Sequence, residues 1–125
     1  MDYNQYFKDY SNSIHSLLNE VNTNLINESV NLIKKTKENN KKIYIVGNGG
    51  SAAMASHVSV DFAKVARVQS STFNNSNLIT CFANDYEYEN WVTEAIRAYC
   101  DIDDLIILIS SSGTSKNIVN AAKYC

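Results

Sequence analysis

The hydrophobic positions of residues 1 to about 40 recur at intervals of three and four, with polar positions between them. This spacing places the apolar side chains on one face, so it predicts an N-terminal helix. The stripe consists of Ile14, Leu17, Leu18, Val21, Leu25, Ile26, Val30 and Ile33. Asn39 and Asn40 are expected to close this helical region.

Three short apolar runs later in the chain are typical of strands. Residues 43–46 are β-branched and aromatic and lie between lysines and glycines. The second run is residues 78–82, with the sequence LITCF. The third, residues 105–109, is wholly apolar, which is typical of a parallel strand covered on both faces.

Helical patterns alternate with these strands. One helix is predicted from residue 52 to about 65, and another begins after residue 115. Between them, Asn84 and Asp85 offer capping oxygens to a helix. Its apolar stripe consists of Tyr88, Trp91, Val92, Ala95, Ile96 and Tyr99. The alternation predicts an α/β fold, a three-layer sandwich around a parallel, flavodoxin-like sheet of strand order 2-1-3.

Such sheets usually contain more than three strands, so we expect the 125 residues to form one incomplete domain. We expect residues 1–40 to form its N-terminal helical region. Residues 41–125 are expected to form an α/β core that contains the binding site described below. The third strand then has an open edge, which predicts a dimer or a larger assembly that covers it.

Composition narrows the function classes. The chain has a formal charge of −2, so it lacks the excess of basic residues that is expected of a nucleic-acid-binding protein. The polar N-terminus is not a signal peptide and no apolar run is long enough to span a bilayer, so a cytoplasmic protein without a membrane partner is expected. Cys81, Cys100 and Cys125 lack CxxC spacing and are expected to be reduced, buried thiols.

A glycine-rich loop follows the first strand and leads into a helix, at residues 47–51. Glycines let backbone amides approach a ligand, and the start of a helix carries unpaired N–H groups and partial positive charge, which favour phosphate. The candidate contacts are Asn48, Gly49, Gly50 and Ser51. Neither GxGxxG nor GxxxxGK[ST] is present, so no nucleotide cofactor is expected. A tight turn without a ligand is the alternative.

A hydroxyl-rich loop, residues 110–115, lies in the equivalent place after the third strand. Its hydroxyls can donate hydrogen bonds to phosphate oxygens at a helix start. The candidate contacts are Ser110, Ser111, Ser112 and Ser115. An ordinary helix cap is the alternative for this loop alone. In a sheet of order 2-1-3, however, both loops fall at the ligand crevice, so a small phosphorylated ligand is predicted.

His57 and Asp61 stand four residues apart on the helix that leaves the glycine loop. They share one helix face, where they can transfer a proton beside a carbonyl or contribute two ligands to a divalent ion. The alternative is a surface pair without chemistry.

Three segments together carry a resemblance to a known family: VGNGGSAAMASH, CFANDYEYEN and LIILISSSGTSKNIVNAA. In this order they closely resemble the sugar isomerase (SIS) domain family, in its phosphoheptose isomerase branch. The resemblance implies isomerisation of sedoheptulose 7-phosphate to D-glycero-D-manno-heptose 7-phosphate through an enediol. It also implies a homo-oligomer, usually a tetramer with active sites between subunits.

Carried over by position, the family's substrate contacts fall on three groups of residues. They are Asn48 with Gly49 and Gly50, Asn84 with Asp85, and the serines at 110, 111, 112 and 115, which would hold the phosphate. In several members zinc is bound by a histidine that matches His57 and a glutamate that matches Asp61. That glutamate is also the acid/base group, and Asp61 is one methylene shorter.

The family's second catalytic group, a histidine, and a glutamine ligand lie in a segment beyond residue 125. We therefore expect this chain to be catalytically incomplete by itself. Two alternatives remain open. One is a non-catalytic SIS module that binds a phosphosugar or a protein partner, and the other is an isomerase for a different phosphosugar.

Overall fold

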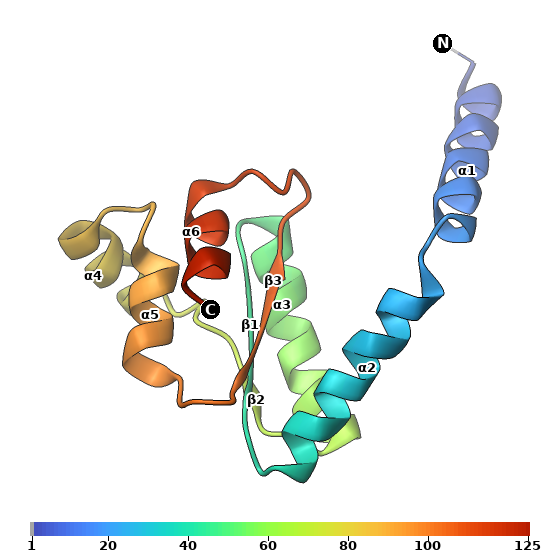
Figure 1. The fold of residues 1–125 in the computed structure, drawn as a ribbon. Coiled ribbons are helices and arrows are strands. Elements are labelled where there is room, and N and C mark those ends of the chain that lie inside the picture. Colours follow the sequence, from blue (N-terminus) through green and yellow to red (C-terminus); the bar gives the residue numbers. More distant parts are fainter. Residues whose placement is uncertain (1) are drawn as a thin grey trace. The chain divides into compact units, whose positions relative to one another are not determined.

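The computed structural model describes residues 2–125, which separate into two compact units (Figure 1). The first unit ends at Asn31 and contains α1 (Tyr3–Asn19) and the first part of α2 (Thr23–Glu38). The helical character predicted for this region is confirmed, but it is divided between two helices rather than continuous. The second helix begins after Asn22, whose side-chain oxygen accepts hydrogen bonds from the backbone N–H groups of Asn24 (3.0 Å) and Leu25 (3.3 Å). Asn22 thus acts as the N-cap of α2.

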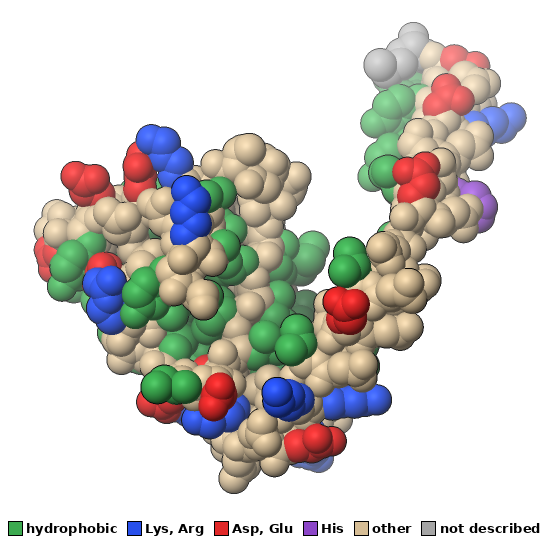
Figure 2. All heavy atoms as spheres, viewed as in Figure 1, with side chains coloured by type: hydrophobic (Ala, Val, Ile, Leu, Met, Phe, Trp, Pro, Cys, Tyr) green, Lys and Arg blue, Asp and Glu red, His purple; other side chains and the backbone are tan. Residues whose placement is uncertain are grey.

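The apolar stripe of the first unit faces solvent in the single chain. Figure 2 shows hydrophobic side chains along α1. The exposed set in this unit comprises Tyr3, Tyr6, Phe7, Tyr10, Ile14, Leu17, Leu18, Val21, Leu25, Ile26 and Val30. Isolated exposed apolar residues are ordinary, but a contiguous apolar stripe of this length is typical of a surface that another protein covers.

The second unit, Leu32–Cys125, is built around a three-stranded parallel sheet. Its strands are β1 (Ile43–Gly47), β2 (Ser70–Ser71) and β3 (Leu105–Ile109). The order β2-β1-β3 matches the predicted 2-1-3 arrangement. Because β1 is central, all five of its residues are buried, whereas those of β3 are only half-buried.

Side chains of β1 alternate between two hydrophobic clusters, so the unit has the predicted three layers. Tyr44 and Val46 pack in the cluster that contains Trp91. Ile43 and Ile45 pack in the other cluster. The first layer contains α4 (Ser76–Tyr86), α5 (Trp91–Tyr99) and α6 (Lys116–Tyr124), and the opposite layer contains α3 (Gly50–Asp61) and the π-helix η1 (Phe62–Ala66).

The strand predicted at residues 78–82 is wrong, because this segment lies inside α4. Asn75 caps the helix by accepting a hydrogen bond from the Asn77 backbone N–H at 2.9 Å. The residues that pack on the core are Leu78, Ile79, Phe82 and Ala83. These positions recur at intervals of three and four, as on one face of a helix. The strand prediction followed instead from the run of consecutive residues that favour strands. The real second strand, Ser70–Ser71, is too short and polar to show a hydrophobic pattern.

Asn84 and Asp85 are consequently not helix caps. They lie near the C-terminus of α4, and the next helix begins only at Trp91. Tyr88, which was expected on that helix, lies in the connection between α4 and α5.

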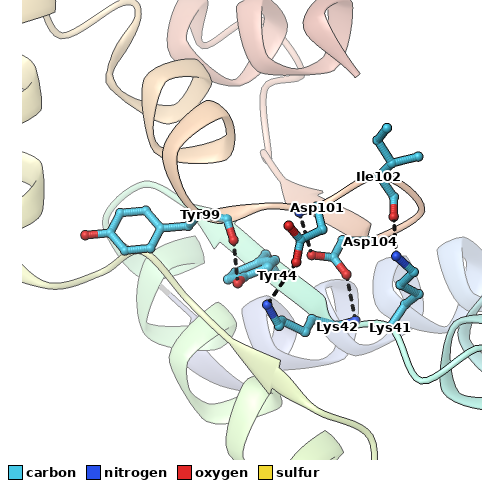
Figure 3. A network of polar contacts seen from close by, with 7 residues as sticks. All are labelled: Lys41, Lys42, Tyr44, Tyr99, Asp101, Ile102 and Asp104. Carbon is cyan, nitrogen blue, oxygen red and sulfur yellow. Dashed lines mark hydrogen bonds and ion pairs between the residues drawn. The ribbon is translucent and has the colours of Figure 1, made fainter.

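The amino ends of β1 and β3 are pinned together by a polar network (Figure 3). The Asp104 carboxylate accepts hydrogen bonds from the backbone N–H groups of Lys42 (2.9 Å) and Asp101 (3.0 Å). The Lys42 ammonium lies 3.3 Å from the Asp101 carboxylate, which raises the pKa of Lys42. Tyr44 donates its hydroxyl to the Tyr99 carbonyl at 3.0 Å.

The three cysteines are free, as expected, but their predicted burial is wrong for two of them and only partly met by the third. Cys81 and Cys125 are exposed and Cys100 is half-buried. Cys81 was expected in a buried strand, whereas it lies on the outer side of α4. Within residues 2–125, no helix has the length and hydrophobicity that crossing a bilayer requires.

Candidate anion-binding site

The glycine loop and the serine loop leave the sheet side by side. Gly47 at the end of β1 and Ile109 at the end of β3 are Cα partners in the parallel ladder. Each loop then opens a helix, α3 after the glycine loop and α6 after the serine loop. The carboxyl ends of these strands therefore bring together two helix N-termini, whose N–H groups and partial positive charge favour an anion.

Close packing explains the glycine that begins the first loop. A Cβ on Gly47 would lie 2.6 Å from the Ser51 carbonyl carbon and 2.7 Å from its oxygen, so only glycine allows α3 to begin this close to β1. Gly49 has φ +52°, a left-handed conformation that glycine adopts readily. Gly49 and Gly50 are exposed, whereas Asn48 and Ser51 are half-buried.

Two hydroxyls of the serine loop shape its turn. Ser110 Oγ accepts a hydrogen bond from the Gly113 N–H, and Ser112 Oγ accepts one from the Thr114 N–H, both at 3.2 Å. Ser115 occupies the N-cap of α6 but makes no side-chain capping bond. Ser111 and Ser112 are exposed. In the two hydrogen bonds of the turn, the hydroxyl oxygens of Ser110 and Ser112 act only as acceptors. The O–H groups of the loop serines therefore remain able to donate to a ligand.

The cation next to this loop is held elsewhere. Lys116 begins α6, and its ammonium lies 2.5 Å from the Glu89 carboxylate. The hydrogen bond to Glu89 raises the pKa of Lys116. An anion at the serine loop would thus be bound by hydroxyl and backbone donors.

The side chains of Asn117 and Tyr88 both bind that of Asn48. The sequence analysis did not assign either of them to the site. Asn48 Nδ2 donates to Asn117 Oδ1 at 3.0 Å, and Asn117 Nδ2 donates back to Asn48 Oδ1 at 2.8 Å. The Tyr88 hydroxyl donates to Asn48 Oδ1 at 3.2 Å. Asn117 lies on the buried face of α6 with Ile118 and Ala121. An asparagine within that apolar stripe was the available signal.

His57 and Asp61 lie on one face of α3, as their spacing predicts. His57 Nε2 is 3.5 Å from Asp61 Oδ2, and the two side chains are 80 % and 53 % exposed. With the rise of an α-helix, they lie about 10 Å and about 16 Å along the axis from Gly50. The pair therefore lies well away from the glycine loop along α3.

Asn84 and Asp85 form a separate exposed pair on α4. Asn84 Nδ2 donates to Asp85 Oδ1 at 2.9 Å, and the Cys81 thiol lies 3.7 Å from Asp85 Oδ2. The chain passes from this pair directly into the connection that carries Tyr88.

Comparison with known proteins identifies the family. The family model described as "SIS domain" matches residues 5–125. The chain belongs to the SIS domain family. Phosphoheptose isomerase 2 of Campylobacter jejuni is 36 % identical over 107 residues, covering 79 % of this chain and 52 % of that protein. A phosphoheptose isomerase of Helicobacter pylori is 37 % identical over 103 residues, covering 78 % and 54 %.

Solved structures agree on the fold. The phosphoheptose isomerase of Neisseria gonorrhoeae matches with a TM-score of 0.88 at 24 % identity, covering 99 % of this chain and 68 % of that one. The enzyme of Francisella tularensis matches with a TM-score of 0.85 at 22 % identity, covering 98 % and 66 %. The chain spans about half the length of the curated relatives it matches.

The zinc that the SIS resemblance implies would be held, within this chain, by His57 and Asp61. Among residues 2–125, no group of three or more His, Cys, Asp or Glu side chains is arranged to hold a metal. His57 and Asp61 supply two donors, whereas a catalytic zinc normally has three protein ligands.

Proposed function

We propose that this SIS chain binds a phosphorylated sugar and serves aldose–ketose isomerisation, with sedoheptulose 7-phosphate converted to D-glycero-D-manno-heptose 7-phosphate. The observation that carries the proposal is the pairing of Gly47 with Ile109, which places the glycine loop beside the serine loop. Similarity to phosphoheptose isomerases supports the substrate class.

The serine loop is the proposed phosphate end of the site. Hydroxyls of Ser110, Ser111, Ser112 and Ser115 would donate to the phosphate oxygens, together with the first N–H groups of α6. Asn48, Gly49, Gly50 and Ser51 would contact the sugar from the first loop, and Asn84 and Asp85 would do so from α4. Phosphate at one end of the ligand fixes the position of the reacting carbons at the other.

Asp61 is the proposed acid/base group. Its carboxylate would take a proton from C1 of the ketose while the C2 carbonyl oxygen gains a proton, leaving an enediol. Return of the first proton to C2, with loss of the O1 proton, then gives the aldose. The SIS resemblance assigns the transfer between the two oxygens to a histidine that lies beyond residue 125. His57 lies close enough to orient that carboxylate. No step uses a metal, and metal content is checked separately by elemental analysis of the wild type and of His57→Ala.

A second candidate, binding without turnover, is favoured by the same two residues. Asp61 is one methylene shorter than the glutamate of the family pattern, which sets its carboxylate back by about 1.5 Å, and displacements of this size cost on the order of 100-fold in rate. Both side chains are also more than half exposed in this chain. A regulatory module that holds a phosphosugar or a protein partner would need the loops but not the acid/base pair.

Self-association belongs to the same proposal. The exposed apolar stripe of residues 3–30 and the half-buried β3 are surfaces that a homo-oligomer would cover. The three free cysteines support a reducing compartment, and we propose the cytoplasm.

The test is to incubate a full-length version of the protein with sedoheptulose 7-phosphate while measuring its thermal stability and following the sugar by NMR. Ser112→Ala and Ser115→Ala should abolish most of the ligand-induced stabilisation. Ser13→Ala is the matched control, because Ser13 is an exposed serine on α1 whose hydroxyl donates to the Asp9 carbonyl.

Each result has a distinct meaning. Stabilisation with appearance of the aldose supports the isomerase, and stabilisation without conversion supports the binding module. Stabilisation that survives both loop substitutions would refute the phosphate assignment, and no response in the wild type would refute both functions.

A further inference from the structure

The side chain of Asn48 is held by groups from two other elements of the fold. Asn117 on α6 makes the reciprocal amide pair described above, and Tyr88 adds a hydroxyl from the connection between α4 and α5. Asn117 is 2 % exposed, so its amide has no access to bulk water. A buried amide strongly favours an arrangement that satisfies its hydrogen bonds, which makes Asn48 its required partner.

Counting donors and acceptors shows what remains available. Asn48 Oδ1 accepts from both Asn117 and Tyr88, which occupies its two lone pairs. One N–H of the Asn48 amide donates to Asn117. The second N–H has no acceptor among residues 2–125. Among the residues described, the network therefore leaves one unused N–H on the buried Asn117 and one on Asn48, and only Asn48 adjoins the exposed Gly49 and Gly50.

The segment that carries Tyr88 is itself held in place. Glu89 binds Lys116 at 2.5 Å, and its carbonyl accepts a hydrogen bond from Asn120 at 3.0 Å, so both contacts tie the segment to α6. Glu87 has φ +67° and ψ 151°, a region that is essentially restricted to glycine. Strain of this kind persists only where surrounding contacts over-determine the backbone. Segment 87–90 thus acts as a fixed support that brings the Tyr88 hydroxyl to Asn48.

We propose that Asn117 and Tyr88 are positioning residues that hold the Asn48 amide so that its free N–H donates to an oxygen of the sugar. This inference rests on the proposed function, and it adds a division of labour within the site. The serine loop binds the phosphate, and the Asn48 network recognises the hydroxyl-bearing or carbonyl-bearing part of the ligand. Loss of the network should weaken binding of a sugar phosphate and leave binding of inorganic phosphate unchanged.

The experiment compares Tyr88→Phe, Asn117→Asp and the wild type in the full chain. Tyr88 is about half exposed, so Tyr88→Phe removes one hydroxyl without disturbing the core. Tyr86→Phe is the matched control, because Tyr86 is 48 % exposed and no hydrogen bond to its hydroxyl is made within residues 2–125. Dissociation constants are measured by calorimetry for sedoheptulose 7-phosphate and for inorganic phosphate. Side-chain amide NMR of Asn48 is recorded without ligand.

Tyr88→Phe should weaken sugar phosphate binding about three- to tenfold, the range of one hydrogen bond, with phosphate affinity within about twofold of the wild type. The Asn48 amide signals should shift and become more mobile in Tyr88→Phe and Asn117→Asp but not in Tyr86→Phe. Unchanged Asn48 signals in Tyr88→Phe, or parallel losses for both ligands, would overturn the positioning role. An ordered Asn48 amide in a wild type that binds neither ligand would instead refute the proposed function, and with it the ligand part of this inference.

Discussion

Gly47 and Ile109 are Cα partners at the carboxyl end of the β1–β3 ladder, and each is the last residue of its strand. Parallel pairing therefore determines that the glycine loop and the serine loop begin at the same edge of the sheet. The opposite edge is different in kind, because Lys42, Asp101 and Asp104 bind one another there. The amino end of the sheet carries this network, and the carboxyl end carries the two loops from which α3 and α6 begin.

Gly47→Ala should destabilise the chain by about 1–3 kcal/mol, the usual cost of forcing atoms into a packed region. The new Cβ would meet backbone atoms of Ser51, which cannot move without shifting the start of α3. Urea denaturation measures the loss. Gly50→Ala is the control, since nothing lies within 4 Å of a Cβ at that position. Equal denaturation midpoints for the two variants would contradict the packing argument.

Glu87→Gly should stabilise the chain by about 1 kcal/mol, because glycine adopts the Glu87 conformation without the strain that other residues bear. The Glu87 backbone has φ +67° and ψ 151°. Glu87→Ala removes the same carboxylate but keeps the strain, so it should show no comparable gain. Thermal denaturation distinguishes the two. A larger gain for alanine than for glycine would show that charge, and not backbone strain, is the cause.

Asp104→Asn should destabilise the second unit by about 1–2 kcal/mol, since charge-assisted hydrogen bonds are among the stronger ones. The two carboxylate oxygens of Asp104 accept hydrogen bonds from the backbone N–H groups of Lys42 and Asp101. An asparagine would place its own NH₂ donor against one of these two N–H groups. The control is Asp103→Asn, because Asp103 is exposed and has φ +71°, which asparagine tolerates. The measurement is the denaturation midpoint of each variant, and equal losses in both would refute the role of the network.

Stability should also fall in alkaline solution because of Cys100. Burial, with a smaller contribution from the nearby Asp104 charge, raises the pKa of the Cys100 thiol from 9.0 to about 12. The folded state thus keeps the proton that the unfolded state releases first, so this contribution to stability is complete below pH 9 and is lost as the pH rises toward 12. Denaturation midpoints measured from pH 8 upward should decline less steeply in Cys100→Ala than in the wild type.

Alkylation gives a second readout for the same thiol. At pH 8, iodoacetamide should modify the exposed Cys81 well before Cys100, because the reagent attacks the thiolate. Mass spectrometry of peptides resolves the two sites. Equal rates at Cys81 and Cys100 would contradict the burial of Cys100.

Much of the candidate site could be predicted because its signals are local. Gly47 and Gly49 are required by a tight approach and a left-handed backbone within five residues of chain, and the serines that follow β3 mark a second loop. Asn117 could not be assigned a role in this way. Its partner Asn48 lies 69 positions away, and only packing of α6 beside β1 brings the two amides together.

The sequence by itself determined β1, β3, the two loops and the helical face of α3, because continuous apolar runs and residue spacing act over a single element. The tertiary structure decided which segment became β2. Ser70 and Ser71 form a strand only because the edge of β1 offers them partners at Ile43 and Tyr44, while the more strand-like run at 78–82 gains more by burying one helical face on the core. Strand pairing satisfies backbone hydrogen bonds between distant segments, so the choice depends on contacts that no local pattern encodes.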